Sequence, residues 1–144
     1  MRYLLLASHG NLAEGMLDSL EMITGHHDNI FVISAYKNDE SDFKSQLKSV
    51  LAQISISDEL IIITDIFGGS VNNESLKIMN DKRVHLIAGL NLALVIELVT
   101  RMNSNIFTDE LIESSLKNAK DTMIYCNLIS QKKDKRRGFL REEE

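Results

Sequence analysis

Short apolar runs alternate along the chain with longer segments in which apolar residues recur every three or four positions. The runs are rich in Ile, Leu and Val, which predicts buried strands. They fall at residues 2–8, 30–36, 59–65, 84–88 and 122–129. The segments with helical period fall at residues 12–24, 41–54, 70–80, 91–102 and 109–120. This alternation predicts a single doubly wound α/β domain, with a mainly parallel central sheet and helices on both faces.

Glycine and short polar residues mark the expected ends of these helices. Gly25 stands where the first helix should end in a left-handed conformation. Asp39 or Ser41 is the expected N-cap of the second helix, and Thr108 that of the last. Proline is absent from the chain, so no turn is set by a locked φ angle.

Two strand exits are more polar and glycine-rich than the others. Ser8-His9-Gly10-Asn11 follows the first strand, and Asp65-Ile66-Phe67-Gly68-Gly69-Ser70 follows the third. Ligands of open α/β sheets gather at the carboxyl ends of the strands, where the strand order reverses. These two segments are therefore the first place to look for a site.

His9 is a candidate base, metal ligand or nucleophile, and equally a plain polar residue at the end of a strand. Asp65 ends the third strand, where an aspartate often serves only as a turn or capping residue. Paired across neighbouring strands, however, the carboxylate would accept a hydrogen bond from one imidazole nitrogen. The other nitrogen would then keep its lone pair free to attack, as in catalytic triads.

Gly68, Gly69 and Ser70 open the third predicted helix. Their backbone N–H groups and the hydroxyl would converge on an anion without a lysine or arginine, which makes them a candidate phosphate cradle. An ordinary loop with Ser70 as helix cap explains the same residues.

Other phosphate-binding motifs are not met. The stretch from Gly10 to Gly15 has the glycine spacing of a P-loop, but Met16 and Leu17 occupy the positions that require Lys and Ser or Thr. No dinucleotide fingerprint of three glycines follows the first strand. Residues 7–11 also lack the acidic pair that holds Mg²⁺ in receiver domains, so Asp65 is a poor phosphate acceptor.

Composition and charge narrow the class of protein. The chain has 144 residues, 44% of them hydrophobic and 26% charged, which is typical of one soluble globular domain without a membrane span. The net charge is −5, and residues 131–144 carry six basic and four acidic groups, leaving −7 for residues 1–130. An acidic body argues against a grip on nucleic acid. The single cysteine and the lack of a leader pattern predict a cytoplasmic setting.

The remaining candidates are weaker. His26, His27 and Asp28 are the other dense group of metal-ligating types, but no matching group is evident elsewhere. His85 alternates within a predicted strand and is expected to be a packed core residue or an edge residue. Cys126, also in a predicted strand, is expected to be a small buried hydrophobic residue. Residues 132–137 are basic and would contact an acidic partner, or form a solvated terminus.

Taken together, three segments resemble the IIA component of the mannose-type sugar phosphotransferase system. They are LLASHGNLAEGMLDSLEMITG (5–25), IIITDIFGGSVNN (61–73) and IAGLNLALVIEL (87–98). The resemblance runs over residues 1–128 and divides the chain into a IIA domain at 1–129 and a charged tail at 130–144. It implies that His9 is phosphorylated, that Asp65 bonds its other ring nitrogen, and that Gly68, Gly69 and Ser70 bind the phosphoryl group.

The resemblance also implies partners and an assembly. The histidine phosphocarrier protein would donate the phosphoryl group, and a IIB component would accept it for sugar uptake. The protein would be a homodimer with an exchanged, antiparallel C-terminal strand, for which residues 122–129 are the candidate. Transfer between two histidines would need no metal or cofactor. The chain departs from the family pattern at Val71 and Ala93, where proline is usual.

Two other functions fit the same motifs. A regulatory module would use the phosphorylation state of His9 to control contact with another protein, without passing the phosphate on. A phosphate donor to a dihydroxyacetone kinase would use the same type of domain.

Overall fold

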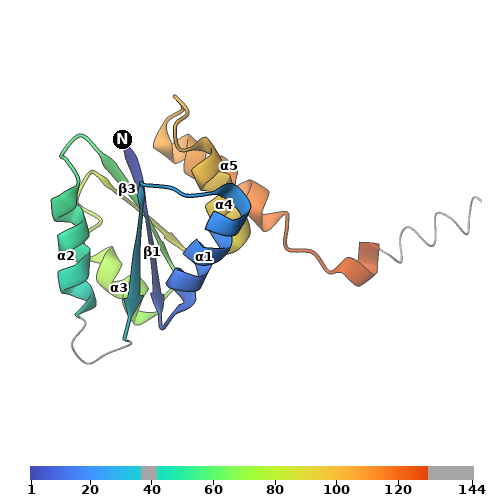
Figure 1. Ribbon diagram of the computed structural model, residues 1–144, viewed down its shortest axis with the longest axis horizontal. Helices are drawn as coiled ribbons and strands as arrows, with labels where there is room; N and C mark the ends of the chain where they lie inside the picture. The colour runs from blue at the N-terminus through green and yellow to red at the C-terminus, as the bar shows by residue number, and fades with distance from the viewer. Residues whose placement is uncertain (37–41, 130–144) are drawn as a thin grey trace, which may run out of the picture.

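The computed structural model describes residues 1–36 and 42–129 as one sheet covered by helices (Figure 1). Four strands lie in the order β2-β1-β3-β4, and all neighbours are parallel. The strands are β1 (Arg2–His9), β2 (Ile30–Ala35), β3 (Glu59–Thr64) and β4 (Val84–Ala88). The helices are α1 (Leu12–Thr24), α2 (Phe43–Gln53), α3 (Ser70–Leu76), α4 (Leu92–Arg101) and α5 (Thr108–Lys120). The parallel α/β architecture predicted from the alternating pattern is confirmed.

The two central strands are apolar on both faces because helices cover both sides. In β1, Leu4 and Leu6 point to one side while Leu5 and Ala7 point to the other, and all four are fully buried. This explains why β1 and β3 are continuous apolar runs without the alternation of a half-exposed strand.

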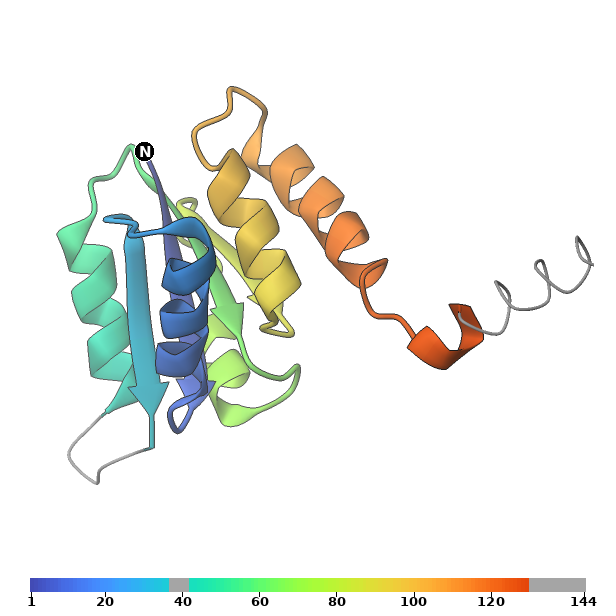
Figure 2. The same ribbon diagram turned by 45° about the vertical axis from the view of Figure 1, so that its right-hand side comes forward.

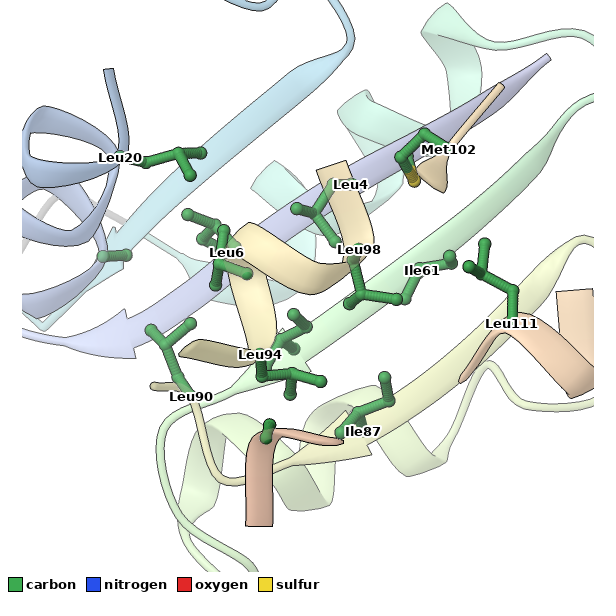
Figure 3. Packing of buried hydrophobic residues seen from close by; sticks show 14 residues of the cluster. Leu4, Leu6, Leu20, Ile61, Ile87, Leu90, Leu94, Leu98, Met102 and Leu111 are labelled. Carbon is green, nitrogen blue, oxygen red and sulfur yellow. The ribbon is translucent and has the colours of Figure 1, made fainter. Parts of the chain in front are cut away.

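The helices form one layer on each face of the sheet (Figures 1 and 2). On one face, α1, α4 and α5 pack over a cluster in which Leu6, Ile61, Leu94 and Leu98 meet (Figure 3). On the other face, α2 and α3 close a second cluster that includes the fully buried Val71. Burial on both sides fixes the strand ends from which the polar residues at positions 9 and 65 project.

Several element boundaries differ from the prediction. Asp42 caps α2 by accepting a hydrogen bond from Lys44 N–H at 3.0 Å, whereas the expected caps at 39 and 41 lie outside the described residues. Thr108 is the first residue of α5 and not its cap, and its hydroxyl accepts a hydrogen bond from Arg2 Nε at 2.9 Å. Helix α3 ends at Leu76, and turns replace the predicted helical residues up to position 80.

The predicted strand at residues 122–129 is not formed within this chain. The segment leaves α5, extends away from the sheet and ends in a helical turn at residues 126–129 (Figure 2). Its residues are exposed, including Met123, Ile124 and Tyr125. A strand needs a neighbour to satisfy its backbone groups, and this segment pairs with none of the four described strands.

No helix within residues 1–36 and 42–129 is both long and apolar enough to span a bilayer.

Candidate active site

The candidate site lies at the carboxyl edge of the sheet, where β1 and β3 end side by side. His9 is the last residue of β1, and Asp65 directly follows β3. Gly10 then turns the chain toward α1 with a φ of +57°, a conformation that favours glycine. The adjacent ends of β1 and β3 therefore bring the two polar segments together, as the sequence predicts.

Asp65 holds His9 at two points. Its Oδ2 accepts a hydrogen bond from His9 N–H at 2.8 Å and lies 2.7 Å from ring Nδ1, while its Oδ1 accepts from Ile66 N–H at 3.0 Å. Burial of the Asp65 carboxyl opposes its ionisation, but the hydrogen bonds from His9 and Ile66 outweigh burial and place the pKa of Asp65 below its ordinary value. An ionised Asp65 can only accept a hydrogen bond, so the proton lies on Nδ1, and this fixes the imidazole tautomer.

Ser70 faces the other ring nitrogen. Its Oγ lies 3.1 Å from His9 Nε2. With the proton on Nδ1, Nε2 carries the lone pair and the serine hydroxyl donates to it. The His9 side chain is 45% exposed, whereas the Asp65 side chain is only 11% exposed, so the imidazole is the more accessible group of the pair.

The glycine-rich loop between Asp65 and α3 is held by two asparagines. Gly68 has a φ of +81°, which favours glycine. Its N–H donates to Asn72 Oδ1 at 3.3 Å, and its carbonyl accepts from Asn73 Nδ2 at 3.2 Å. Asn72 is almost fully buried and also donates to Thr64 Oγ1 at 2.9 Å, tying the loop to the end of β3.

Two of the residues predicted to bind the phosphoryl group, Gly68 and Gly69, use their N–H groups in hydrogen bonds within the loop. The Gly69 N–H donates to Ile66 O at 3.3 Å, and the Gly68 N–H is used by Asn72 at the same length. Both bonds are long, so an anion has weak internal partners to displace. A Cβ added to Gly69 would lie only 2.8 Å from Ile66 Cγ2, so glycine lets the loop fold tightly against Ile66, whereas the 3.5 Å from the same Cβ to His9 Cε1 is an ordinary contact.

The sequence does not predict two further residues at this edge. Tyr36 follows β2, and its ring stacks on the His9 imidazole with centroids 5.3 Å apart. Asn72 reads in the sequence as an ordinary polar residue of a helix. Only the glycine pair and the polar cluster at 72–73 hinted at a structured loop, and no local signal pointed to Tyr36.

Exposed apolar side chains lie on the segments that flank the histidine. Leu12, Tyr36, Ile66 and Phe67 all have at least 49% of their surface exposed, and Phe67 reaches 82%. They lie on the loops and the first helical turn beside His9. Exposed apolar groups that gather around a reactive residue are typical of a surface that contacts another protein.

The weaker candidates do not join this site. His26 Nε2 pairs with Asp28 Oδ1 at 2.7 Å, and His27 Nε2 contacts Thr24 Oγ1 at 2.7 Å, both in the loop after α1. His85 lies on β4 and pairs with Glu59 Oε2 at 2.7 Å near the other edge of the sheet. Among the described residues, no three His, Cys, Asp or Glu side chains come together as a metal site.

Cys126 is exposed and lies in the helical turn at residues 126–129, so the buried strand position predicted for it is not formed within this chain.

Comparison with known proteins gives matches over most of the chain. Residues 3–116 match the family described as "PTS system fructose IIA component" (EIIA-man). A structure from Klebsiella pneumoniae, described as a phosphoenolpyruvate-dependent sugar phosphotransferase system permease, is 42% identical. The alignment covers 88% of this chain and 91% of that one, with a TM-score of 0.80. The PTS IIA protein associated with the fucose utilization operon from Streptococcus pneumoniae is 30% identical, with coverages of 88% and 94% and a TM-score of 0.76.

A curated relative is longer than this chain. The mannose-specific EIIAB component of Escherichia coli is 23% identical over 120 residues, which are 82% of this chain and 37% of that protein. The match therefore spans little more than a third of the relative.

Proposed function

The chain belongs to the mannose-type IIA family of the sugar phosphotransferase system, and we propose that it is a phosphoryl carrier in which His9 accepts and passes on the phosphoryl group. The observation that carries the proposal is the geometry of the His9 ring. Its Nδ1 is 2.7 Å from the Asp65 carboxylate, whose side chain is only 11% exposed, and its Nε2 is 3.1 Å from the Ser70 hydroxyl, on a side chain that is 45% exposed.

The reaction is a transfer between two imidazoles. The Nε2 lone pair of neutral His9 forms the new bond to phosphorus, while the bond from phosphorus to the donor's histidine nitrogen breaks. The donor ring carries a proton on its other nitrogen and is cationic before transfer, so the electron pair that stays on the donor nitrogen leaves a neutral imidazole. The Nδ1 proton of His9 stays in its hydrogen bond to Asp65, so no proton is gained or lost overall. Such transfers pass through a loose transition state and depend on positioning and charge stabilisation.

Each neighbour of His9 has a defined part in this step. Asp65 keeps the proton on Nδ1 and stabilises the positive charge that the ring acquires as Nε2 bonds to phosphorus. The Ser70 hydroxyl, 3.1 Å from Nε2, turns from the nitrogen to the phosphoryl oxygens. Gly68 supplies the positive φ that the loop requires and Gly69 the room beside Ile66, and their weakly bonded N–H groups are the further donors to the phosphoryl group.

The partners are proteins, as a carrier requires. The histidine phosphocarrier protein is the proposed donor and a IIB component the proposed acceptor, in the cytoplasm. The exposed apolar side chains around His9, Phe67 above all, suit protein contact. The acidic balance of residues 1–130 suits a partner face that mixes apolar and basic groups.

Phosphorylation by purified components tests the carrier role. The chain is incubated with phosphoenolpyruvate, the general phosphotransferase enzyme and the histidine phosphocarrier protein, and intact mass is measured at neutral and acid pH. We expect one acid-labile phosphoryl group on the wild type and none on His9→Ala. His26→Ala is the matched control, because His26 is an exposed histidine away from the site. Equal labelling of His9→Ala would refute the role of His9.

The proposed protein is a homodimer in which residues 122–129 of each chain add an antiparallel strand to the other. The segment exposes Met123, Ile124 and Tyr125 and pairs with none of the described strands. The outer edge of β4 has no neighbour among the described strands. A groove of about 510 Å³ between the end of β4 and α5, lined in part by Leu90 and Leu116, lies where the exposed segment begins.

Sedimentation velocity of the full chain tests the exchange. We expect a dimer for the wild type and a monomer for Tyr125→Asp, because a charge in a buried strand disfavours pairing. Met22→Asp is the control, since Met22 is an apolar residue on α1 that is even more exposed than Tyr125. A wild type that stays monomeric at high concentration would contradict the dimer.

A further inference from the structure

The ring of Tyr36 covers one face of the candidate reactive histidine. The two rings have centroids 5.3 Å apart and an interplanar angle of 30°. The neighbouring backbone is fixed, because β1 and β2 pair in parallel with His9 opposite Ala35, and Gly10 N–H donates to Ala35 O at 2.9 Å. The stack is therefore built from the ends of two adjacent strands.

Tyr36 adopts a backbone conformation that its side chain disfavours. Its φ is +62°, and among the described residues it is the only non-glycine residue with a positive φ. The left-handed region is uncommon for a bulky residue, and such conformations concentrate at functional sites. Glycine at this position would remove the strain but also the ring.

We infer that Tyr36 is a positioning residue for phosphoryl transfer by His9, an inference that rests on the proposed function. Asp65 fixes the imidazole at Nδ1, Ser70 faces Nε2, and Tyr36 limits the tilt of the ring plane between them. The stack has a second effect during the reaction. As Nε2 bonds to phosphorus the imidazole becomes cationic, and an aromatic face within about 6 Å of a cation stabilises it.

The conformational strain allows function to be separated from folding. Tyr36→Gly removes the ring and relieves the positive φ, so its thermal unfolding midpoint is expected not to fall while transfer slows. Tyr36→Leu removes the aromatic face but keeps an apolar side chain. For both variants we expect phosphoryl uptake to slow about fivefold, the equivalent of ~1 kcal/mol. Tyr36→Phe retains the stack and is expected to restore most of the rate.

A remote aromatic pair provides the matched control. Tyr3 packs against Phe31 in a tilted arrangement with centroids 5.7 Å apart, at the opposite end of β1 from His9. Tyr3→Leu therefore removes an aromatic contact of similar kind without touching the site, and its uptake rate is expected to equal that of the wild type.

Nuclear magnetic resonance of the His9 ring gives a readout that needs no phosphate donor. Long-range ¹⁵N–¹H spectra report which ring nitrogen carries the proton, and the ring protons report the shielding by Tyr36. We expect Tyr36→Gly to shift these protons and to mix the tautomers, whereas Tyr3→Leu leaves both unchanged. A Tyr36→Gly variant with wild-type uptake rate, or with unchanged His9 ring shifts, would overturn the inference.

The failure of the proposed function has a different signature. If His9→Ala is labelled as well as the wild type, the carrier role of His9 is wrong, whatever the Tyr36 variants do. If labelling depends on His9 but not on the ring at position 36, only the inference about Tyr36 is wrong.

Discussion

One oxygen atom of Asp65 accepts two hydrogen bonds from His9. Oδ2 lies 2.8 Å from the backbone nitrogen of His9 and 2.7 Å from its ring Nδ1. The backbone bond fixes where the carboxylate sits relative to β1, and the ring bond then fixes how the imidazole is turned. Because both bonds end on one oxygen, a change at position 65 alters the place and the protonation of the ring together.

Asp65→Asn is expected to slow phosphoryl uptake by His9 on the order of 100-fold. The neutral amide oxygen of asparagine accepts the hydrogen bond from Nδ1–H less strongly than a carboxylate does, and it stabilises the cationic ring less. Rapid-quench measurement of uptake from the phosphorylated phosphocarrier checks this. Asp58→Asn is the matched control, because Asp58 accepts comparable bonds from Ser55 N–H and the N-terminal ammonium. If Asp65→Asn took up the phosphoryl group as fast as the wild type, the orienting role of Asp65 would be contradicted.

The lowered pKa of Asp65 makes the stability of the fold depend on pH. This pKa is lower in the folded protein than its ordinary value of about 3.9, so below the ordinary value the unfolded chain binds more protons than the folded one. The stabilisation is therefore complete above the ordinary pKa and is lost as the pH falls through the lower, folded value. Urea unfolding between neutral pH and pH ~2 is expected to show the free energy of Asp65→Asn falling less steeply than that of the wild type.

Comparing how the free energy of unfolding falls at acid pH in the wild type and in Asp65→Asn separates the contribution of Asp65 from that of other carboxyl groups. Glu59 and Asp81 also have lowered pKa values, and they steepen this fall in both proteins. Their effect cancels in the difference between wild type and variant. If the free energy of unfolding fell equally steeply with pH in the two proteins, the hydrogen bonds to His9 would not stabilise the ionised form of Asp65.

The sequence identifies the strand-exit pair because its cause is largely local. Apolar runs predict β1 and β3, parallel strands end at one edge, and His9 and Asp65 then meet without further information. Tyr36 and Asn72 could not be found in this way. The contact of Tyr36 depends on a positive φ after β2, and that of Asn72 on a tertiary partner, Thr64, eight residues earlier.

For the segment 122–129 the apolar pattern predicts a strand that this chain does not form by itself. Its apolar residues are those of a strand, but a strand is completed by a neighbouring edge and not by its own sequence. In the described part of the chain no such neighbour meets it, and residues 126–129 form a helical turn instead. The pattern predicts the need for burial, and the partner decides the conformation.

Asn72→Ala is expected to cost about 1–3 kcal/mol of stability, because it removes two hydrogen bonds from an almost fully buried site. It also releases Gly68 and should slow phosphoryl uptake. Asn73→Ala is the matched change at the next, exposed position, where one bond to Gly68 O is lost. We expect it to cost no more than about 0.5 kcal/mol. Denaturant titration compares the two, and equal losses would contradict the tethering role of Asn72.

Two glycine-to-alanine changes are expected to have opposite signs. At Gly69 the new Cβ would meet Ile66 Cγ2 at 2.8 Å, so the loop must shift, at a cost of about 1 kcal/mol and with slower uptake. At Gly15, inside α1, nothing lies within 4 Å of the new Cβ, and alanine should stabilise the helix by about 0.5–1 kcal/mol. Thermal unfolding measures both, and a stabilised Gly69→Ala would show that the loop has room to spare.

Proline substitution tests whether the first turns of α3 and α4 tolerate the residue usual in the family. In α4, Asn91 caps the helix by accepting from Leu94 N–H at 2.9 Å, and the backbone bonds begin with Val95 N–H. The N–H of Ala93 is therefore not needed for a helical bond. Ala93→Pro is expected to stabilise the fold by up to about 1 kcal/mol, through a less flexible unfolded chain.

The equivalent change in α3 is expected to gain less. Val71 also precedes the first backbone bond of its helix, from Asn73 N–H to Gly69 O, but its side chain is fully buried in the second core. Val71→Pro therefore replaces packed methyl groups with a ring of different shape, which offsets the gain from chain stiffness. Denaturant unfolding of both variants decides the point. A loss of stability in Ala93→Pro would mean that the first turn of α4 has a φ that proline cannot adopt.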